Sequence, residues 1–197
     1  MKCLFDILKT EPDYTRFLMA VQKGFVPLAA SGLSNVHKAL LSAALNTHTG
    51  KKISIITPDE QTAVSLKGDL ESMGLNCLTF YARDFNTERV TGYSKEYEHK
   101  RVDTLSRVLD GAFDVLLIPV DAALQYTLPP EILKQNIINI SSTDTINVAD
   151  FCSALVSAGY VRSELCEGVG QFAVRGGIID VFATGNDHPI RIDLWGD

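Results

Sequence analysis

Uninterrupted apolar runs alternate with helical patterns through the first 141 residues of this 197-residue chain. Segments with apolar residues at helical spacing, such as residues 96–109, separate the runs. Continuous apolar strands joined by helices are typical of a parallel sheet that is covered on both faces. The sequence therefore predicts an α/β domain with a parallel sheet over residues 1–141. The expected strands are 26–30, 53–56, 77–81, 115–120 and 137–140.

The pattern changes after Ser141. Asn147 is suited to cap a helix with Val148, Phe151 and Leu155 on its apolar face, and Gly159 is suited to follow its last turn. Hairpin-rich β structure after a βα domain predicts a second, smaller α+β domain over residues 142–197. Its expected strands are 160–165, 171–174, 178–182 and 190–194. We expect this domain to be truncated at its C-terminus, since no terminal signal follows the last strand.

One loop in the first domain matches the motif of a phosphate-binding loop in part. In the motif G-x-x-x-x-G-K-[ST], the second glycine lets backbone N–H groups close on a phosphate, and the hydroxyl binds Mg²⁺. Gly32 and Lys38 keep their places here, but His37 replaces the second glycine and Ala39 replaces the hydroxyl residue. An imidazole thus takes the place of the phosphate. The sequence predicts a degenerate P-loop NTPase-like domain that has lost its nucleotide.

No other residue of this domain indicates catalysis. Lys38 alone is more simply a solvated surface residue, although a helix N-terminus can attract an anion. Asp114, Asp121 and Asp144 fall near expected strand ends, where α/β enzymes place catalytic groups. No partner base or metal cluster accompanies these acids in the sequence, so we predict no catalytic residue in this chain.

Charge and cysteine usage narrow the class of protein. The formal charge of −6 disfavours a protein that wraps nucleic acid. The four cysteines and four histidines lack metal-ligand spacing, so we expect reduced thiols and no metal. No apolar run is long enough to span a membrane, and no signal peptide opens the sequence. We expect a cytoplasmic protein without a membrane partner.

Two blocks near the end of the chain resemble a known family. They are residues 170–182, GQFAVRGGIIDVF, and residues 189–197, PIRIDLWGD. They are similar to domain 2, which the excision-repair protein UvrB shares with the transcription-repair coupling factors of the Mfd family. In both families a helicase-like domain 1A precedes domain 2. The resemblance implies a UvrB domain 1A-like fold for residues 1–141 and a domain 2-like fold for residues 142–197.

Two departures favour the coupling factors over UvrB. The first is the degraded loop from Gly32 to Ala39. The second is the segment 81–98, which is shorter and less aromatic than the DNA-gripping hairpin of UvrB. Its aromatic residues are Tyr81, Phe85, Tyr93 and Tyr97. The resemblance implies an N-terminal segment without ATPase activity; in the full-length coupling factor, a DNA translocase, ATP and Mg²⁺ serve a separate module, and RNA polymerase and double-stranded DNA are further partners.

Domain 2 of this family docks the repair protein UvrA, and the resemblance implies that role for Arg162 and Arg175. Phe182 is a further candidate, as part of an apolar patch that faces UvrA. Exposed arginine offers a planar fork to partner carboxylates and is frequent among interface hot spots. The structural alternative is that Phe182 is a packing residue and that each arginine pairs with a local acid. The candidate acids are Glu164, Asp180 and Asp193. The pair Gly176-Gly177 predicts a tight turn.

Three functions remain open at this point. The leading interpretation is a module that recruits UvrA in transcription-coupled nucleotide excision repair. The alternative is a fragment of a UvrB-type, ATP-dependent repair helicase that binds nucleotide through Lys38. A nonspecific DNA-binding module is the third, and the acidic balance disfavours it.

Overall fold

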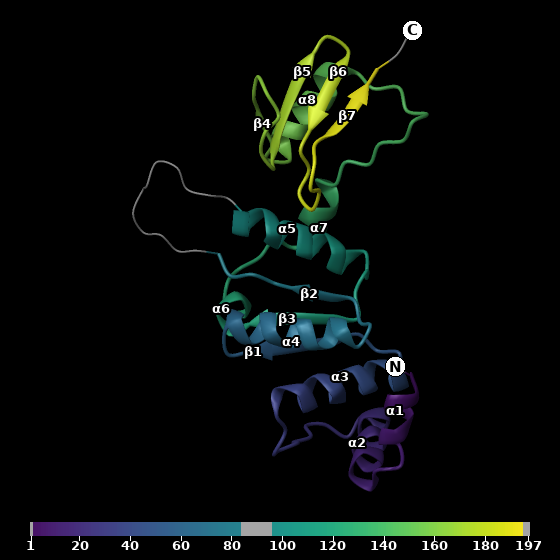
Figure 1. Cartoon of the computed structure of the whole chain (residues 1–197). Helices are drawn as coiled ribbons and strands as arrows, with labels where there is room; N and C mark the ends of the chain where they lie inside the picture. The colour runs from purple at the N-terminus through teal and green to yellow at the C-terminus, as the bar shows by residue number, and fades with distance from the viewer. Residues whose placement is uncertain (1, 84–95, 195–197) are drawn as a thin grey trace. The chain divides into compact units, whose positions relative to one another are not determined.

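The computed structural model describes residues 2–83 and 96–194. The chain divides into two compact units, each with its own sheet (Figure 1). The first unit comprises residues 1–82 and 110–125, and the second comprises residues 83–109 and 126–197. The predicted domain boundary at residue 141 stays a prediction.

The first unit contains a parallel sheet of three strands in the order β1-β3-β2. Its strands are β1 (Ile53–Thr57), β2 (Cys77–Thr79) and β3 (Val115–Pro119). Its helices are α1 (Lys2–Leu8), α2 (Pro12–Lys23), α3 (Asn35–Thr49), α4 (Glu60–Ser72) and α6 (Val120–Ala123). Val115 is the register partner of both Ile53 and Cys77, so β3 is the central strand. The predicted α/β class and parallel sheet are confirmed.

The core of the first unit lies between its helices and the sheet. Small residues of α3 pack against larger residues of α4 and of the strands, and Ala39, Leu70 and Leu117 are fully buried. Cys77 belongs to this core as a free thiol, and burial raises the pKa of this thiol to about 11. Side chains of α1 and α2 complete the cluster, which ties both helices to α3.

The prediction of a strand at residues 26–30 is wrong. The chain from Phe25 to Ser34 is irregular, and Phe25 and Val26 are 64% and 75% exposed. Pro27 has no backbone N–H with which to pair in a sheet ladder. The strand–loop–helix context of a P-loop is therefore not found around Gly32 in the described residues.

Among its described residues, the second unit combines three helices with a sheet of four strands in the order β4-β5-β6-β7. Its helices are α5 (Glu96–Leu109), α7 (Pro130–Gln135) and α8 (Val148–Ser157). Its strands are β4 (Val161–Arg162), β5 (Gln171–Arg175), β6 (Ile178–Val181) and β7 (Ile190–Asp193). Strand β4 is parallel to β5, and the other neighbours are antiparallel. The four strands predicted after Ser141 are thus confirmed.

Local capping sets the limits of α8 as the sequence predicts. The Asn147 side chain accepts hydrogen bonds from the backbone N–H groups of Ala149 and Asp150, at 2.9 and 3.2 Å. Gly159 follows the last turn with a φ of +94°, a left-handed conformation that favours glycine. Helix α8 packs Phe151 and Leu155 against one face of the sheet.

The prediction of a strand at residues 137–140 is also wrong. This segment is irregular and half exposed, and it follows directly from the end of α7, where Ile137 N–H bonds to the Lys134 carbonyl. An apolar run predicts burial but does not supply a neighbouring strand with which to pair. Of the aromatic segment 81–98, residues 84–95, with Phe85 and Tyr93, lie outside the described residues, as does Trp195.

Candidate functional site

The two faces of the second sheet differ in chemistry. Strand register places Phe172 opposite Val181 and Val174 opposite Ile179, and these residues join the core beneath α8. Successive side chains of a strand point to opposite faces. The remaining residues of β5 and β6 therefore belong to the other face, which we call the outer face. It carries Gln171, Ala173, Arg175, Ile178 and Asp180.

Arg175 and Phe182 share the outer face but stand at opposite ends of the β5–β6 hairpin. Arg175 is the last residue of β5 and is exposed, directly before the turn in which Gly176 has a φ of +61°. The tight turn predicted at Gly176-Gly177 is thus confirmed. Phe182 is half-buried beyond β6, where its N–H donates to the Gln171 carbonyl at 2.9 Å. Four residue steps along β5 separate the two ends, roughly 13 Å.

Arg162 lies on the opposite side of the sheet from Arg175. The parallel register pairs Arg162 with Phe172, a fully buried core residue, and pairs Val161 with Gln171 on the outer face. Neighbouring residues in register share a face. Arg162 is therefore an exposed residue at the α8 side of the sheet edge, and Val161, 55% exposed, stands beside Gln171.

A loop from Ser163 to Gly170 crosses the outer face between these ends. The Gln171 side chain accepts hydrogen bonds from the backbone N–H groups of Glu167 and Gly168, at 3.2 and 3.0 Å. The Cys166 thiol donates to the Gln171 carbonyl at 3.3 Å. These contacts explain why Ala173, an outer-face residue, is only 2% exposed. The accessible part of the outer face consequently consists of this loop and the two ends of the β5–β6 hairpin.

The local acids do not neutralise the predicted arginines. Arg191 of β7 takes both oxygens of Asp180, through Nε at 2.7 Å and Nη2 at 2.9 Å. Arg175 donates from Nη2 to the backbone carbonyl of Glu164 at 3.2 Å, and this bond does not involve the Glu164 carboxylate. Within residues 2–83 and 96–194, neither Arg162 nor Arg175 forms an ion pair. The Arg175 fork can therefore accept a carboxylate from outside the chain.

Asp180 and Arg191 perturb each other's ionisation. The hydrogen bonds from Arg191 hold the pKa of the Asp180 carboxyl below its usual range, and they raise the pKa of Arg191. Sequence reasoning missed Arg191, although it lies within the block PIRIDLWGD. The strand register sets Arg191 opposite Asp180 on the outer face, and the long connection from Val181 to Ile190 does not reveal that register in the sequence.

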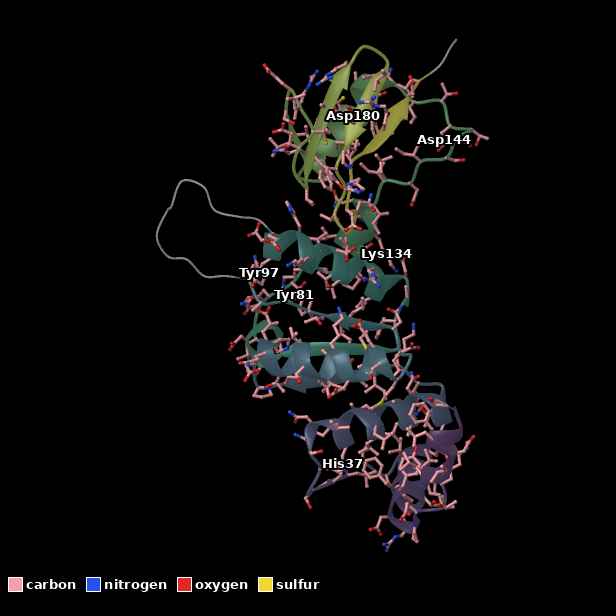
Figure 2. All side chains as sticks on the ribbon, in the orientation of Figure 1. His37, Tyr81, Tyr97, Lys134, Asp144 and Asp180 are labelled. Carbon is pink, nitrogen blue, oxygen red and sulfur yellow. The ribbon has the colours of Figure 1, made fainter. Side chains whose placement is uncertain are left out.

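His37 and Lys38 of the predicted nucleotide loop both contact side chains of the same loop. Ser34 caps α3, and the ring Nδ1 of His37 lies 3.0 Å from the Ser34 hydroxyl oxygen (His37 is labelled in Figure 2). Lys38 Nζ donates to the Asn35 side-chain carbonyl at 3.4 Å. Ala39 is 0% exposed and belongs to the core. This geometry gives the imidazole and the lysine local partners and places the methyl group away from solvent.

None of the helices among the described residues is both long and apolar enough to cross a membrane. Among the same residues, histidine, cysteine, aspartate and glutamate side chains do not gather in groups of three or more that could hold a metal ion.

A family model matches the C-terminal part of the chain. Residues 138–197 match the UvrB interaction domain family, and this range includes Arg162, Arg175, Phe182 and Arg191.

Over nearly its full length, the chain is similar to transcription-repair-coupling factors. It is 28% identical to that of Bacillus subtilis (strain 168) over 191 residues, which cover 95% of this chain and 16% of the relative. It is 28% identical to that of Staphylococcus aureus (strain MRSA252) over 167 residues, covering 84% of this chain and 14% of the relative. The family resemblance read from the sequence is confirmed, and the chain spans about a sixth of the length of these curated relatives.

Proposed function

We propose that this chain is the N-terminal, UvrA-recruiting segment of a transcription-repair coupling factor. It acts in transcription-coupled nucleotide excision repair, and its work is recognition: the segment makes and breaks no bond. RNA polymerase, double-stranded DNA, ATP and Mg²⁺ belong to other modules of the full-length translocase, in the cytoplasm. The similarity to coupling factors and the UvrB interaction domain support this proposal.

The docking role is supported above all by the exposure and the hydrogen bonding of the Arg175 side chain. Its guanidinium stands exposed at the end of β5, bound by one hydrogen bond to a backbone carbonyl, while the outer-face carboxylate of Asp180 is held by Arg191. A planar fork in this state suits a carboxylate of a partner protein. Phe182 and Val161 supply apolar surface at the other end of the same face.

We also propose that the segment does not hydrolyse ATP. The His37 ring bonds to Ser34 at the start of α3, and Ala39 presents a buried methyl group where a P-loop presents a hydroxyl. Both features leave the loop without the open backbone cradle and metal ligand on which nucleotide binding depends.

The test is UvrA binding by this chain and its arginine variants, measured by calorimetry. We expect Arg175→Ala and Arg162→Ala each to weaken binding at least tenfold, about 1.4 kcal/mol. Arg107→Ala, which removes an exposed arginine of α5, is the matched control and should bind as the wild type does.

Because Arg175 and Arg162 lie on opposite faces of the sheet, the two variants also locate the docking surface. A loss confined to Arg175→Ala would limit the docking surface to the outer face, and a loss in both variants would extend it around the β4 edge. Unchanged affinity in both variants, with folding intact by circular dichroism, would overturn the assignment of the site.

A further inference from the structure

The ion pair between Asp180 and Arg191 is built differently from an ordinary surface pair. Two parallel N–H···O bonds join the side chains across β6 and β7, and strand register sets the two residues directly opposite. The Asp180 side chain is 16% exposed and that of Arg191 is 62% exposed. Bidentate geometry fixes the orientation of both groups. A partly exposed pair adds a modest amount of stability, and bidentate Arg–carboxylate geometry is the case in which that amount is measurable. The same geometry also occupies both oxygens of Asp180.

Arg175 is the other cation within reach of Asp180. It is the register partner of Ile178, two residues before Asp180, and so it is a diagonal neighbour on the same face. Diagonal neighbours in antiparallel strands have Cβ atoms about 7–8 Å apart, which an arginine side chain spans. The positive charge of Arg175 already contributes to lowering the pKa of Asp180, after the larger effects of Arg191.

We propose that Arg191 is a positioning residue for docking: by occupying both oxygens of Asp180, it prevents Asp180 from capturing Arg175 and keeps the Arg175 fork free for a carboxylate of UvrA. This inference rests on the proposed function. Without Arg191, Asp180 would hold an unpaired negative charge beside Arg175, and the guanidinium would exchange its single bond to the Glu164 carbonyl for a charged one.

The binding arm of the test uses four variants with purified UvrA. Arg191→Gln should weaken binding about tenfold, because Asp180 then competes with the partner. Asp180→Asn alone should stay within twofold of the wild type, and the double variant Arg191→Gln/Asp180→Asn should return to within twofold. Arg107→Gln removes the same charge from α5 and should leave the affinity unchanged.

The rescue by the second substitution separates positioning from a merely structural or direct contact. If Arg191 touched UvrA itself, or only stabilised the sheet, the double variant would bind no better than Arg191→Gln. That result would overturn the inference, as would a loss in Asp180→Asn alone or an unchanged affinity in Arg191→Gln.

A second arm needs no partner and so remains informative if UvrA does not bind. The Asp180 carboxyl is titrated by carbon-detected NMR in Arg191→Gln and in Arg191→Gln/Arg175→Gln. Capture by Arg175 predicts that the carboxyl pKa stays below its usual range in the single variant and returns to it in the double variant. An ordinary pKa already in Arg191→Gln would refute capture, whatever the binding result. Confirmed capture without UvrA binding would instead refute the proposed function.

Discussion

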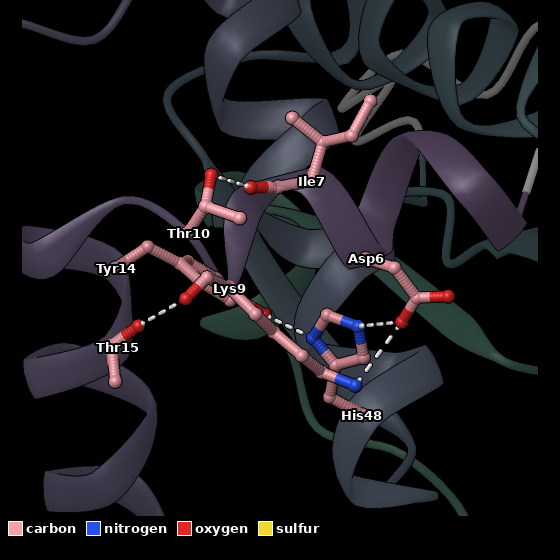
Figure 3. Close-up of polar contacts among 7 residues, drawn as sticks. All are labelled: Asp6, Ile7, Lys9, Thr10, Tyr14, Thr15 and His48. Carbon is pink, nitrogen blue, oxygen red and sulfur yellow. Dashed lines mark hydrogen bonds and ion pairs between the residues drawn. The ribbon is translucent and has the colours of Figure 1, made fainter.

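Nδ1 of His48 lies 2.7 Å from the phenolic oxygen of Tyr14, and this contact joins α3 to α2 (Figure 3). The two rings meet edge to face, with both side chains buried. On the other side of the imidazole, Nε2 lies 3.6 Å from Asp6 Oδ1 of α1. When Tyr14 donates to Nδ1, the ring proton is on Nε2 and faces the carboxylate. One histidine thus connects the three N-terminal helices.

Replacing Tyr14 with phenylalanine should destabilise the first unit. The change keeps the ring but removes the hydroxyl, which leaves the buried Nδ1 of His48 without its partner. An unsatisfied buried polar group costs about 1–3 kcal/mol. Urea unfolding of the wild type and of Tyr14→Phe measures this loss. Tyr126→Phe, at a side chain that is 93% exposed, is the control and should be neutral. Equal stability of the two variants would argue against the role of this contact.

Glycine is expected to be required at residue 185. Its φ is +83°, and a Cβ there would overlap Asp103 Oδ1 of α5 and lie 2.9 Å from Cγ. Gly176 also has positive φ, +61°, but no neighbour lies within 4 Å of its Cβ position. Gly176→Ala should therefore cost only the backbone term, about 1–2 kcal/mol. Gly185→Ala should cost about 1 kcal/mol more, because the Asp103 carboxylate has to turn away from its preferred rotamer.

Thermal unfolding of both glycine variants checks this difference. Because the added cost comes from Asp103, the double variant Gly185→Ala/Asp103→Ala should be closer in stability to Gly176→Ala than to Gly185→Ala. Identical melting of Gly176→Ala and Gly185→Ala would show that α5 does not press on this turn.

Acid should remove the stabilisation that Asp180 supplies. Arg191 lowers the pKa of this carboxyl in the folded chain, so the contribution is complete above the pKa of the unfolded carboxyl, about 4. It is lost as the pH falls further, through the lowered pKa of the folded state. The melting temperatures of the wild type and Asp180→Asn should therefore differ most near neutral pH and converge below about pH 3. Asp187→Asn, at an exposed turn, serves as the control.

Calorimetry with Mg-ATP should detect no saturable binding to this chain. The reasons are the His37–Ser34 contact at the start of α3 and the absence of a hydroxyl at Ala39. His37→Gly alone should not restore binding, because the metal would still lack its side-chain ligand. Micromolar affinity that disappears in Lys38→Ala but persists in Lys51→Ala, a second exposed lysine, would contradict this expectation and support the nucleotide-binding alternative.

Local signals in the sequence predicted structure well, and signals that depend on distant partners did not. Helix α8 follows from Asn147 and Gly159, which act on their own neighbouring backbone. The apolar runs at 26–30 and 137–140 were wrong as strands because pairing depends on other parts of the chain. Both runs are also exposed in the structure, so an apolar run alone establishes neither burial nor strand pairing.

The residues of the candidate site also differ in how well the sequence predicts their positions. Arg175 and Phe182 belong to one hairpin, so alternation around the turn at Gly176 already sets them on one face. The face of Arg162 depends on the parallel pairing of β4 with β5 across the loop from Ser163 to Gly170, which residue type does not reveal.

The burial of Ala39 limits which residues position 39 can accept. A serine or threonine at this position would have to bring a hydroxyl into a packed interior, and an unsatisfied hydroxyl there is costly. Packing therefore constrains residue 39 independently of what the segment binds.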